Sequence, residues 1–428
     1  MEHRHYPALN ETLIHEVLPN GLTIALVPRP GFAKKLAYFV TDYGAIHTEF
    51  SINGTTRTAP AGVAHYLEHK LFDMPGRDIS AEFAALGASV NAFTGFDMTA
   101  YYFSCTENFE QSLNLLLEFV STPYFTEESV AKEQGIIGQE IGMYEDNPES
   151  KIFDLLMQNM YRNHPVRTPI LGTTESIARI TPEILTECHN AFYRPRNMLL
   201  CVVGDVDMEL VRRIALQTLP EKAAQEVSPR LYWPEEMTCP KAYGETKMEV
   251  AMPMFQLGFK CEPMDRGEEA VKIEVIGDLA AEALFGESSR LYLRLYEEGL
   301  IDSAFGGGFE TIEGMAMLTA FGDSDDPEAV FEAILEEGAR LAAEGIPETD
   351  FLRMKRSALG RRIRSLDSFD STCFRICAYH FSGFDYFRFP KVYEKLDRYE
   401  VQEFLRNVVT RQRASLACIY PTNQEETT

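Results

Sequence analysis

The chain has 428 residues, a hydrophobic fraction of 45% and a formal net charge of −25 at pH 7. This length is too great for a single hydrophobic core, so we expect two or more domains with the composition of an ordinary soluble globular protein. The excess of acidic side chains argues against nucleic acid or an anionic membrane as a partner, and no apolar run is long enough to span a bilayer.

The same charge is compatible with peptide partners that carry basic residues. The first residues lack the charged and then apolar layout of a signal peptide, so we expect a cytoplasmic protein. The eight cysteines are scattered along the chain, which favours reduced packing residues over a disulfide framework.

The first half alternates predicted strands and helices. Strand-like runs at 22–28 and 36–40 precede a loop rich in Gly, Thr and Pro, and a helix is predicted at 61–72. The pattern then predicts a helix at 79–86, a strand at 93–105, a buried helix at 113–120, a long helix that opens at 124–128 and runs to 144, and a strand at 199–205. This mixture predicts an α+β unit, in which helices pack on a mixed sheet.

The helix at 61–72 carries two histidines and a carboxylate on one side. His65 and His69 stand four residues apart, one turn above the other, so both can bind one ion. Glu68 lies beside the pair, where it could take a proton from a metal-bound water. The order His-x-x-Glu-His is an inverted form of the His-Glu-x-x-His zinc signature. The alternative is a pair of surface histidines.

A catalytic zinc usually has three protein ligands, so a further ligand is expected elsewhere. On the helix that runs to 144, Glu133 and Glu140 are seven residues apart and nearly superpose on a predicted apolar face with Ile136, Ile137, Ile141, Met143 and Tyr144. Carboxylates in such a place need a cation. A metal ligand with a supporting carboxylate meets that need, and a buried ion pair with an arginine is the alternative.

With these motifs the chain resembles the pitrilysin/insulinase family of zinc peptidases, and most of all its bacterial members of this length related to mitochondrial processing peptidase. The resemblance covers most of the first half. It implies one Zn²⁺ per chain held by His65, His69 and Glu140. It also implies that Glu68 is the catalytic base and that Glu133 supports the ligands.

The run at 87–94 resembles the strand with which this family binds substrate. The resemblance implies that Asn91, Ala92, Phe93 and Thr94 bind the peptide as a further strand.

The second half repeats the first at an offset near 220 residues. The run 36–40 has its counterpart at 255–260, and the run 124–129 at 345–350. The second copy has no histidines at 277–285, so we expect it to bind no metal; chance similarity of two α/β patterns is the alternative. We predict a catalytic zinc-binding α+β domain at 1–220, a linker at 221–240 and a second, metal-free α+β domain at 241–428, as in the mitochondrial processing peptidase-like fold.

The sequence departs from the family at one place. Family members often follow a Ser-Ser-Arg-Leu segment with an Arg and, seven residues on, a Tyr that bind the substrate backbone. Here Ser288-Ser289-Arg290-Leu291 is present, but Tyr296 stands at the Arg position and Asp302 or Ser303 at the Tyr position.

We therefore predict a zinc metalloendopeptidase that hydrolyses peptides or unfolded segments with metal-activated water, inside a chamber formed by two halves or by two chains. The departure leaves an alternative, a weak or inactive zinc-binding subunit that acts as a partner in a heterodimeric peptidase. A homologous subunit that forms a heterodimer is the expected partner, and a homodimer is the competing expectation.

Overall fold

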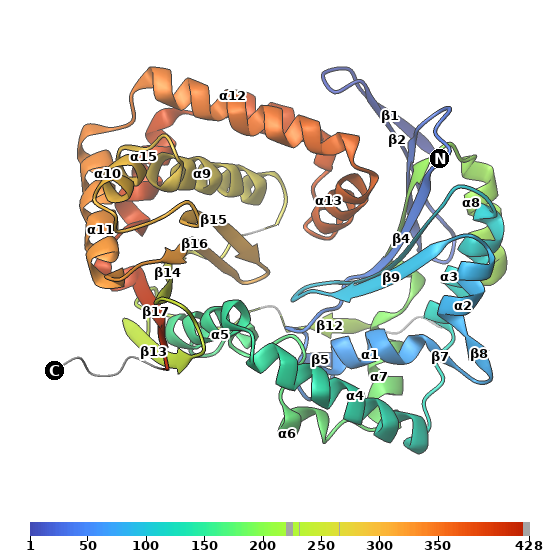
Figure 1. Cartoon of the computed structure of the whole chain (residues 1–428). Helices are drawn as coiled ribbons and strands as arrows, with labels where there is room; N and C mark the ends of the chain where they lie inside the picture. The colour runs from blue at the N-terminus through green and yellow to red at the C-terminus, as the bar shows by residue number, and fades with distance from the viewer. Residues whose placement is uncertain (220–225, 231, 265, 423–428) are drawn as a thin grey trace. The chain divides into compact units, whose positions relative to one another are not determined.

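The computed structural model describes residues 1–219, 226–230, 232–264 and 266–422 (Figure 1). Residues 221–225 and 231 of the predicted linker at 221–240 lie outside the described residues, and the linker stays a prediction. The chain forms two compact units, unit 1 at 1–141, 169–231 and 363–388, and unit 2 at 142–168, 232–362 and 389–428. No helix of the described part is long and apolar enough to cross a membrane.

The main sheet of unit 1 has seven strands in the order β1-β2-β3-β11-β4-β10-β9. Its strands are β1 (Glu2–Tyr6), β2 (Glu11–Val17), β3 (Thr23–Pro28), β4 (Lys35–Thr41), β9 (Ser89–Thr94), β10 (Thr99–Cys105) and β11 (Met198–Gly204). A smaller three-stranded sheet contains β5 (Glu49–Ile52), β6 (Thr55–Thr58) and β12 (Val227–Pro229). A two-stranded sheet contains β7 (Asp73–Met74) and β8 (Arg77–Asp78).

The helices of unit 1 supply most of the cover for this sheet. They are α1 (Val63–Leu71), α2 (Ile79–Ala85), α3 (Phe109–Ser121), most of α4 (Glu127–Glu145), α6 (Thr174–Ile177), α7 (Pro182–Phe192), α8 (Met208–Thr218) and α13 (Phe369–Phe381). Buried residues of the sheet, such as Phe39 and Leu200, form one apolar core with Leu67 of α1, Leu116 of α3 and Ile214 of α8. Burial of this apolar surface holds α1 against the sheet.

Unit 2 is built on a five-stranded sheet in the order β13-β17-β14-β16-β15. Its strands are β13 (Tyr243–Met248), β14 (Met254–Cys261), β15 (Gly306–Ile312), β16 (Met315–Asp323) and β17 (Ala414–Pro421). Its helices are α5 (Pro148–Met160), α9 (Glu268–Phe285), α10 (Arg290–Glu297), α11 (Pro327–Glu344), α12 (Glu348–Arg364), α14 (Phe389–Lys395) and α15 (Arg398–Val408).

Five strands of the unit 1 sheet, β3-β11-β4-β10-β9, have the same order and strand directions as the five strands of the unit 2 sheet. In unit 1 β3 is parallel to β11, and the next pairs to β4, β10 and β9 are antiparallel. In unit 2 β13 is parallel to β17, and the pairs to β14, β16 and β15 are antiparallel. The predicted α+β class and the duplication are therefore confirmed, with β4 and β14 as the strands of the predicted repeat.

Two helices belong to the unit of the other half of the sequence. Helix α5 follows the first-half helix α4 but packs on β14 and β17 of unit 2. Helix α13 follows the second-half helix α12 but packs on β4 and β11 of unit 1. Each unit thus contains a helix that its own half of the sequence does not supply.

Two local predictions were wrong in part. The strand predicted at 93–105 is the hairpin of β9 and β10, because a turn in which the Gly95 N–H donates to the Met98 carbonyl interrupts it. The apolar face predicted for α4 is narrower, because Ile137 and Ile141 are buried whereas Ile136 and Met143 are exposed. Helix α4 therefore contacts the core along a narrow stripe.

Candidate metal centre

Helix α1 starts at a point that only glycine tolerates. Gly62 has a positive φ of 93°, and a Cβ there would lie 2.4 Å from the Leu171 carbonyl oxygen. From this start Tyr66, Leu67 and Leu71 point into the core. The opposite side of the helix is left for its two histidines.

Helix α4 brings the third candidate ligand to α1. The Tyr66 hydroxyl donates a hydrogen bond to the Val130 carbonyl of α4, and Val130, Ile137 and Ile141 are buried. Glu133 and Glu140 share that side of α4 because they lie seven residues, two turns, apart. The buried stripe thus orients both carboxylates toward α1.

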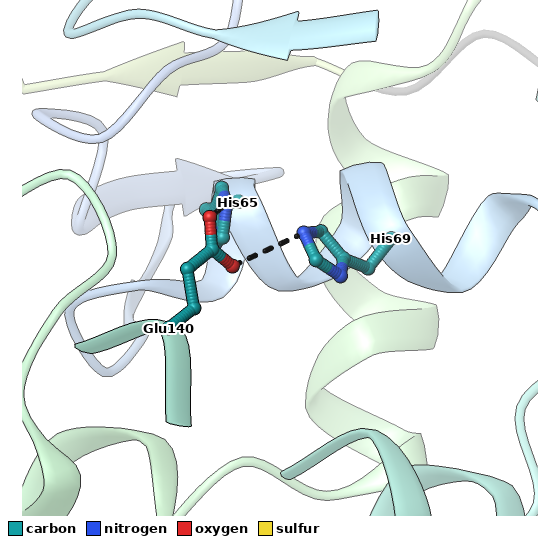
Figure 2. Close-up of side chains that lie close together, drawn as sticks. All are labelled: His65, His69 and Glu140. Atoms are coloured by element: carbon teal, nitrogen blue, oxygen red, sulfur yellow. Dashed lines mark ion pairs between the residues drawn. The ribbon is translucent and has the colours of Figure 1, made fainter. Parts of the chain in front are cut away.

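The side chains of His65, His69 and Glu140 lie close together, with one ligand atom from each within 4.8 Å of the others (Figure 2). Glu140 Oε1 lies 3.6 Å from His65 Nε2, and Oε2 lies 3.5 Å from His69 Nε2. Ligands about 2.0–2.1 Å from a tetrahedral zinc are roughly 3.3 Å apart. The two separations between Glu140 and the histidines are within a few tenths of an ångström of that value, and the ligand atoms of all three residues lie within 4.8 Å of one another, so the residues fit a zinc ion.

Glu133 contacts His69 on the side away from Glu140. Nδ1 of His69 lies 3.0 Å from Glu133 Oε1. Because an ionised carboxylate only accepts hydrogen bonds, Nδ1 must be the donor, and the lone pair of Nε2 is free for a metal. Nδ1 of His65 is buried without a hydrogen-bond partner among the described residues, so the contact of Nε2 with Glu140 and the surrounding packing orient that ring.

The site is electronegative. Burial lowers the pKa of His69, but the hydrogen bond to Glu133 and the charges of Glu140, Glu133 and Glu68 outweigh it, so that the pKa is raised. The hydrogen bond with His65 and the nearby imidazoles lower the pKa of the Glu140 carboxyl. Three carboxylates around two imidazoles favour a cation.

Glu68 stands outside the three-residue cluster, on the same helix. The Thr94 hydroxyl donates a hydrogen bond of 2.6 Å to Glu68 Oε2. Sequence reasoning placed Thr94 in the substrate strand but missed this contact, because nothing in the spacing of the two residues indicates it. The bond leaves the other oxygen of Glu68 available to a reactant.

The predicted substrate residues lie on β9, the edge strand of the sheet. Val90 and Ala92 pack against the core beside α1, and Thr94 reaches Glu68 on the same face. Asn91 and Phe93 alternate with them and point to the other face. The Ala92 N–H donates a hydrogen bond of 2.9 Å to Oδ1 of Asn91 within the same strand.

The Ser-Ser-Arg-Leu segment leads into α10 of unit 2. Ser289 caps the helix by accepting a hydrogen bond from the Tyr292 N–H. Tyr296, at the position where the family resemblance implies an Arg, is exposed, and Arg294 lies 3.6 Å from Glu336. The Asp302 carboxylate accepts a hydrogen bond from the Ala304 N–H.

The chain is similar to known proteins along its whole length. Family models match residues 56–174, "Insulinase (Peptidase family M16)", and 179–358, "Peptidase M16 inactive domain". The uncharacterized zinc protease YmfH of Bacillus subtilis is 38% identical over 97% of this chain and 98% of its own length. The crystal structure of an M16-like peptidase from Alicyclobacillus acidocaldarius has a TM-score of 0.92 at 31% identity, covering 96% of this chain and 99% of that one. The beta subunit of mitochondrial-processing peptidase from Caenorhabditis elegans is 28% identical over 56% of this chain and 53% of its own.

Proposed function

The chain belongs to the insulinase family of peptidases, M16, whose relatives are named zinc proteases, and on that premise we propose that it is a zinc-dependent endopeptidase for extended peptides. The observation that carries the proposal is the cluster of His65, His69 and Glu140, in which Glu140 lies at zinc-ligand separations from both histidines, with a further carboxylate, Glu68, beside it.

His65, His69 and Glu140 would hold the metal, and Glu133 would keep His69 in the tautomer that can bind it. Zinc, when bound, supplies the positive charge that acidifies a water molecule and polarises a peptide carbonyl. Glu68 accepts the proton that the attacking water loses and then donates it to the leaving amine. Thr94 holds Glu68 in place for both transfers.

Strand β9 would bind the peptide by main-chain hydrogen bonds along its free edge. Asn91 must then release the Ala92 N–H to the peptide. Such binding accepts only an extended backbone, so an unfolded segment is a substrate and a compact domain is not.

A decisive experiment compares the purified chain with its Glu68→Gln variant. Both should contain one zinc per chain by elemental analysis, and, with the partner subunit added if one is required, only the unmodified chain should cleave an unstructured peptide internally. Glu128→Gln is the matched control, since Glu128 is an exposed glutamate at the start of α4. Equal cleavage by the Glu68→Gln protein would refute the proposal.

A second candidate function follows from the departure in unit 2. By the family resemblance, Tyr296 and either Asp302 or Ser303 stand where an Arg and a Tyr would bind the substrate backbone, so the chain would have the metal-binding half of a site without that pair. In this alternative the chain is a weakly active zinc-binding subunit that depends on a partner. Its rate with and without a homologous subunit separates the two functions.

A further inference from the structure

The free edge of β9 offers two chemically different faces to an added strand. Val90, Ala92 and Thr94 face α1 and the candidate metal ligands, whereas Asn91 and Phe93 face the other way. Side chains of an added strand alternate between the same two faces. A peptide residue directly opposite Phe93 therefore projects away from the metal ligands.

Helix α13 covers that second face (Figure 1). It packs on β4 and β11 through buried residues such as Cys373 and Cys377. Phe374, the next residue after Cys373, points elsewhere. Its ring centroid lies 5.9 Å from that of Phe93, and 42% of the residue is exposed.

Phe93 and Phe374 extend an aromatic row that begins inside the sheet. Tyr38 of β4 stacks on Tyr102 of β10 at 4.4 Å, and the Phe93 ring lies 6.3 Å from the ring of Tyr102. The row thus crosses from β4 through β10 to Phe93 on the edge strand β9, and it ends at the exposed ring of Phe374 on α13. Contact between this exposed ring and an apolar side chain would remove apolar surface from water, which is favourable.

We propose that Phe93 and Phe374 form a specificity subsite that accepts a large apolar side chain of the peptide, on the face of the added strand away from the metal ligands. The inference rests on the proposed function, because it needs a peptide along β9. The subsite would add a preference for a large apolar side chain, which main-chain binding lacks. One of its two residues, Phe374, lies on a helix from the second half of the sequence.

The test uses two unstructured peptides that differ at one position, Leu in one and Ser in the other. The full-length chain, with its partner subunit if one is required, should cleave the Leu peptide with a kcat/KM higher by roughly tenfold or more. Phe374→Ala should lower kcat/KM for the Leu peptide by about tenfold and leave the Ser peptide nearly unchanged. Zinc content should not change, since Phe374 contacts no candidate ligand.

Phe32→Ala is the matched control. Phe32 is also exposed and also contacts α13, with its ring centroid 5.6 Å from that of Phe369. The Phe32→Ala variant should have the same ratio of kcat/KM for the Leu and Ser peptides as the unmodified chain. If Phe374→Ala still cleaves peptides and its kcat/KM ratio for the Leu and Ser peptides is unchanged, the subsite proposal is refuted while the proposed function stands.

The same peptides also test the inference without turnover. In the Glu68→Gln background, fluorescence titration should show tighter binding of the Leu peptide, and Phe374→Ala should remove the difference. If the Glu68→Gln protein binds neither peptide and the unmodified chain cleaves neither, the proposed function fails and the subsite fails with it.

Discussion

The hydroxyl of Thr94 donates to Oε2 of Glu68, so the last residue of the edge strand β9 touches the proposed base on α1. This contact joins the element that would bind the peptide to the group that would move the proton. It makes Thr94 a positioning residue.

Thr94→Val keeps the shape of the side chain and removes the donor. A hydrogen bond to a charged group contributes about 1.5–3 kcal/mol, so we expect kcat to fall by about 10- to 100-fold with zinc content unchanged. Thr94→Ser keeps the hydroxyl and should restore most of the rate. Steady-state kinetics decide, and a Val variant with the full kcat would contradict the role.

His65→Ala, His69→Ala and Glu140→Ala should each abolish stoichiometric zinc binding. Each change removes one of three ligand atoms, and the zinc affinity should fall by more than the roughly 10- to 100-fold loss typical of a supporting partner. Competition with a chromogenic chelator measures that affinity. A full equivalent of zinc in Glu140→Ala would exclude Glu140 as a ligand.

Glu133→Gln should have an intermediate effect. Glutamine can still accept a hydrogen bond from His69 Nδ1 but carries no charge, so we expect zinc affinity to fall by roughly tenfold. Glu133→Ala should lose more, because His69 then has no partner for Nδ1. If both variants bind zinc and turn over normally, Glu133 is merely structural.

Asp154 in α5 should make folding stability depend on pH. Burial raises the pKa of this carboxyl to about 6, despite the hydrogen bond from Tyr144. Because the unfolded chain loses the proton near pH 4 and the folded chain only near pH 6, unfolding becomes easier as pH rises through this window. The cost above pH 6 is roughly 2–3 kcal/mol.

Asp154→Asn removes this proton exchange. The stability of Asp154→Asn relative to the unmodified chain should therefore increase between pH 4 and pH 6 and stay constant above. Urea unfolding of the chelator-treated proteins measures the difference, with Asp146→Asn, at an exposed site, as the control. A difference that does not vary with pH would show that the Asp154 pKa is not raised.

The chain should need a homologous partner for rapid turnover. The family resemblance places an Arg and a Tyr at positions that this chain fills with other residues, so we expect a peptide held by β9 alone to be poorly placed, and misplacement by about 1 Å costs roughly a hundredfold. We expect a heterodimer with a similar-sized chain that carries an Arg-x6-Tyr pattern. Light scattering and a cleavage assay on the isolated chain decide. Brisk cleavage without a partner, abolished by Glu68→Gln, would favour a self-sufficient homodimer.

The sequence alone was enough to pair the candidate residues on each helix because the spacing within a helix is local, and the family resemblance joined the two pairs into one site. His65 and His69 are one helical turn apart on α1, and Glu133 and Glu140 are two turns apart on α4. The internal repeat likewise predicted two related α+β units, because a duplicated pattern of apolar runs yields a duplicated sheet, and the structure adds their matching strand orders.

Other features depended on contacts between segments far apart in the chain. The bond between Thr94 and Glu68, the place of Phe374 beside Phe93, and the exchange of α5 and α13 between the units appear only in the folded chain. Periodicity shows which side of a helix is apolar, but not which surface it meets. That choice is made by packing over the whole core, so only the tertiary structure decided which residues surround the candidate ligands.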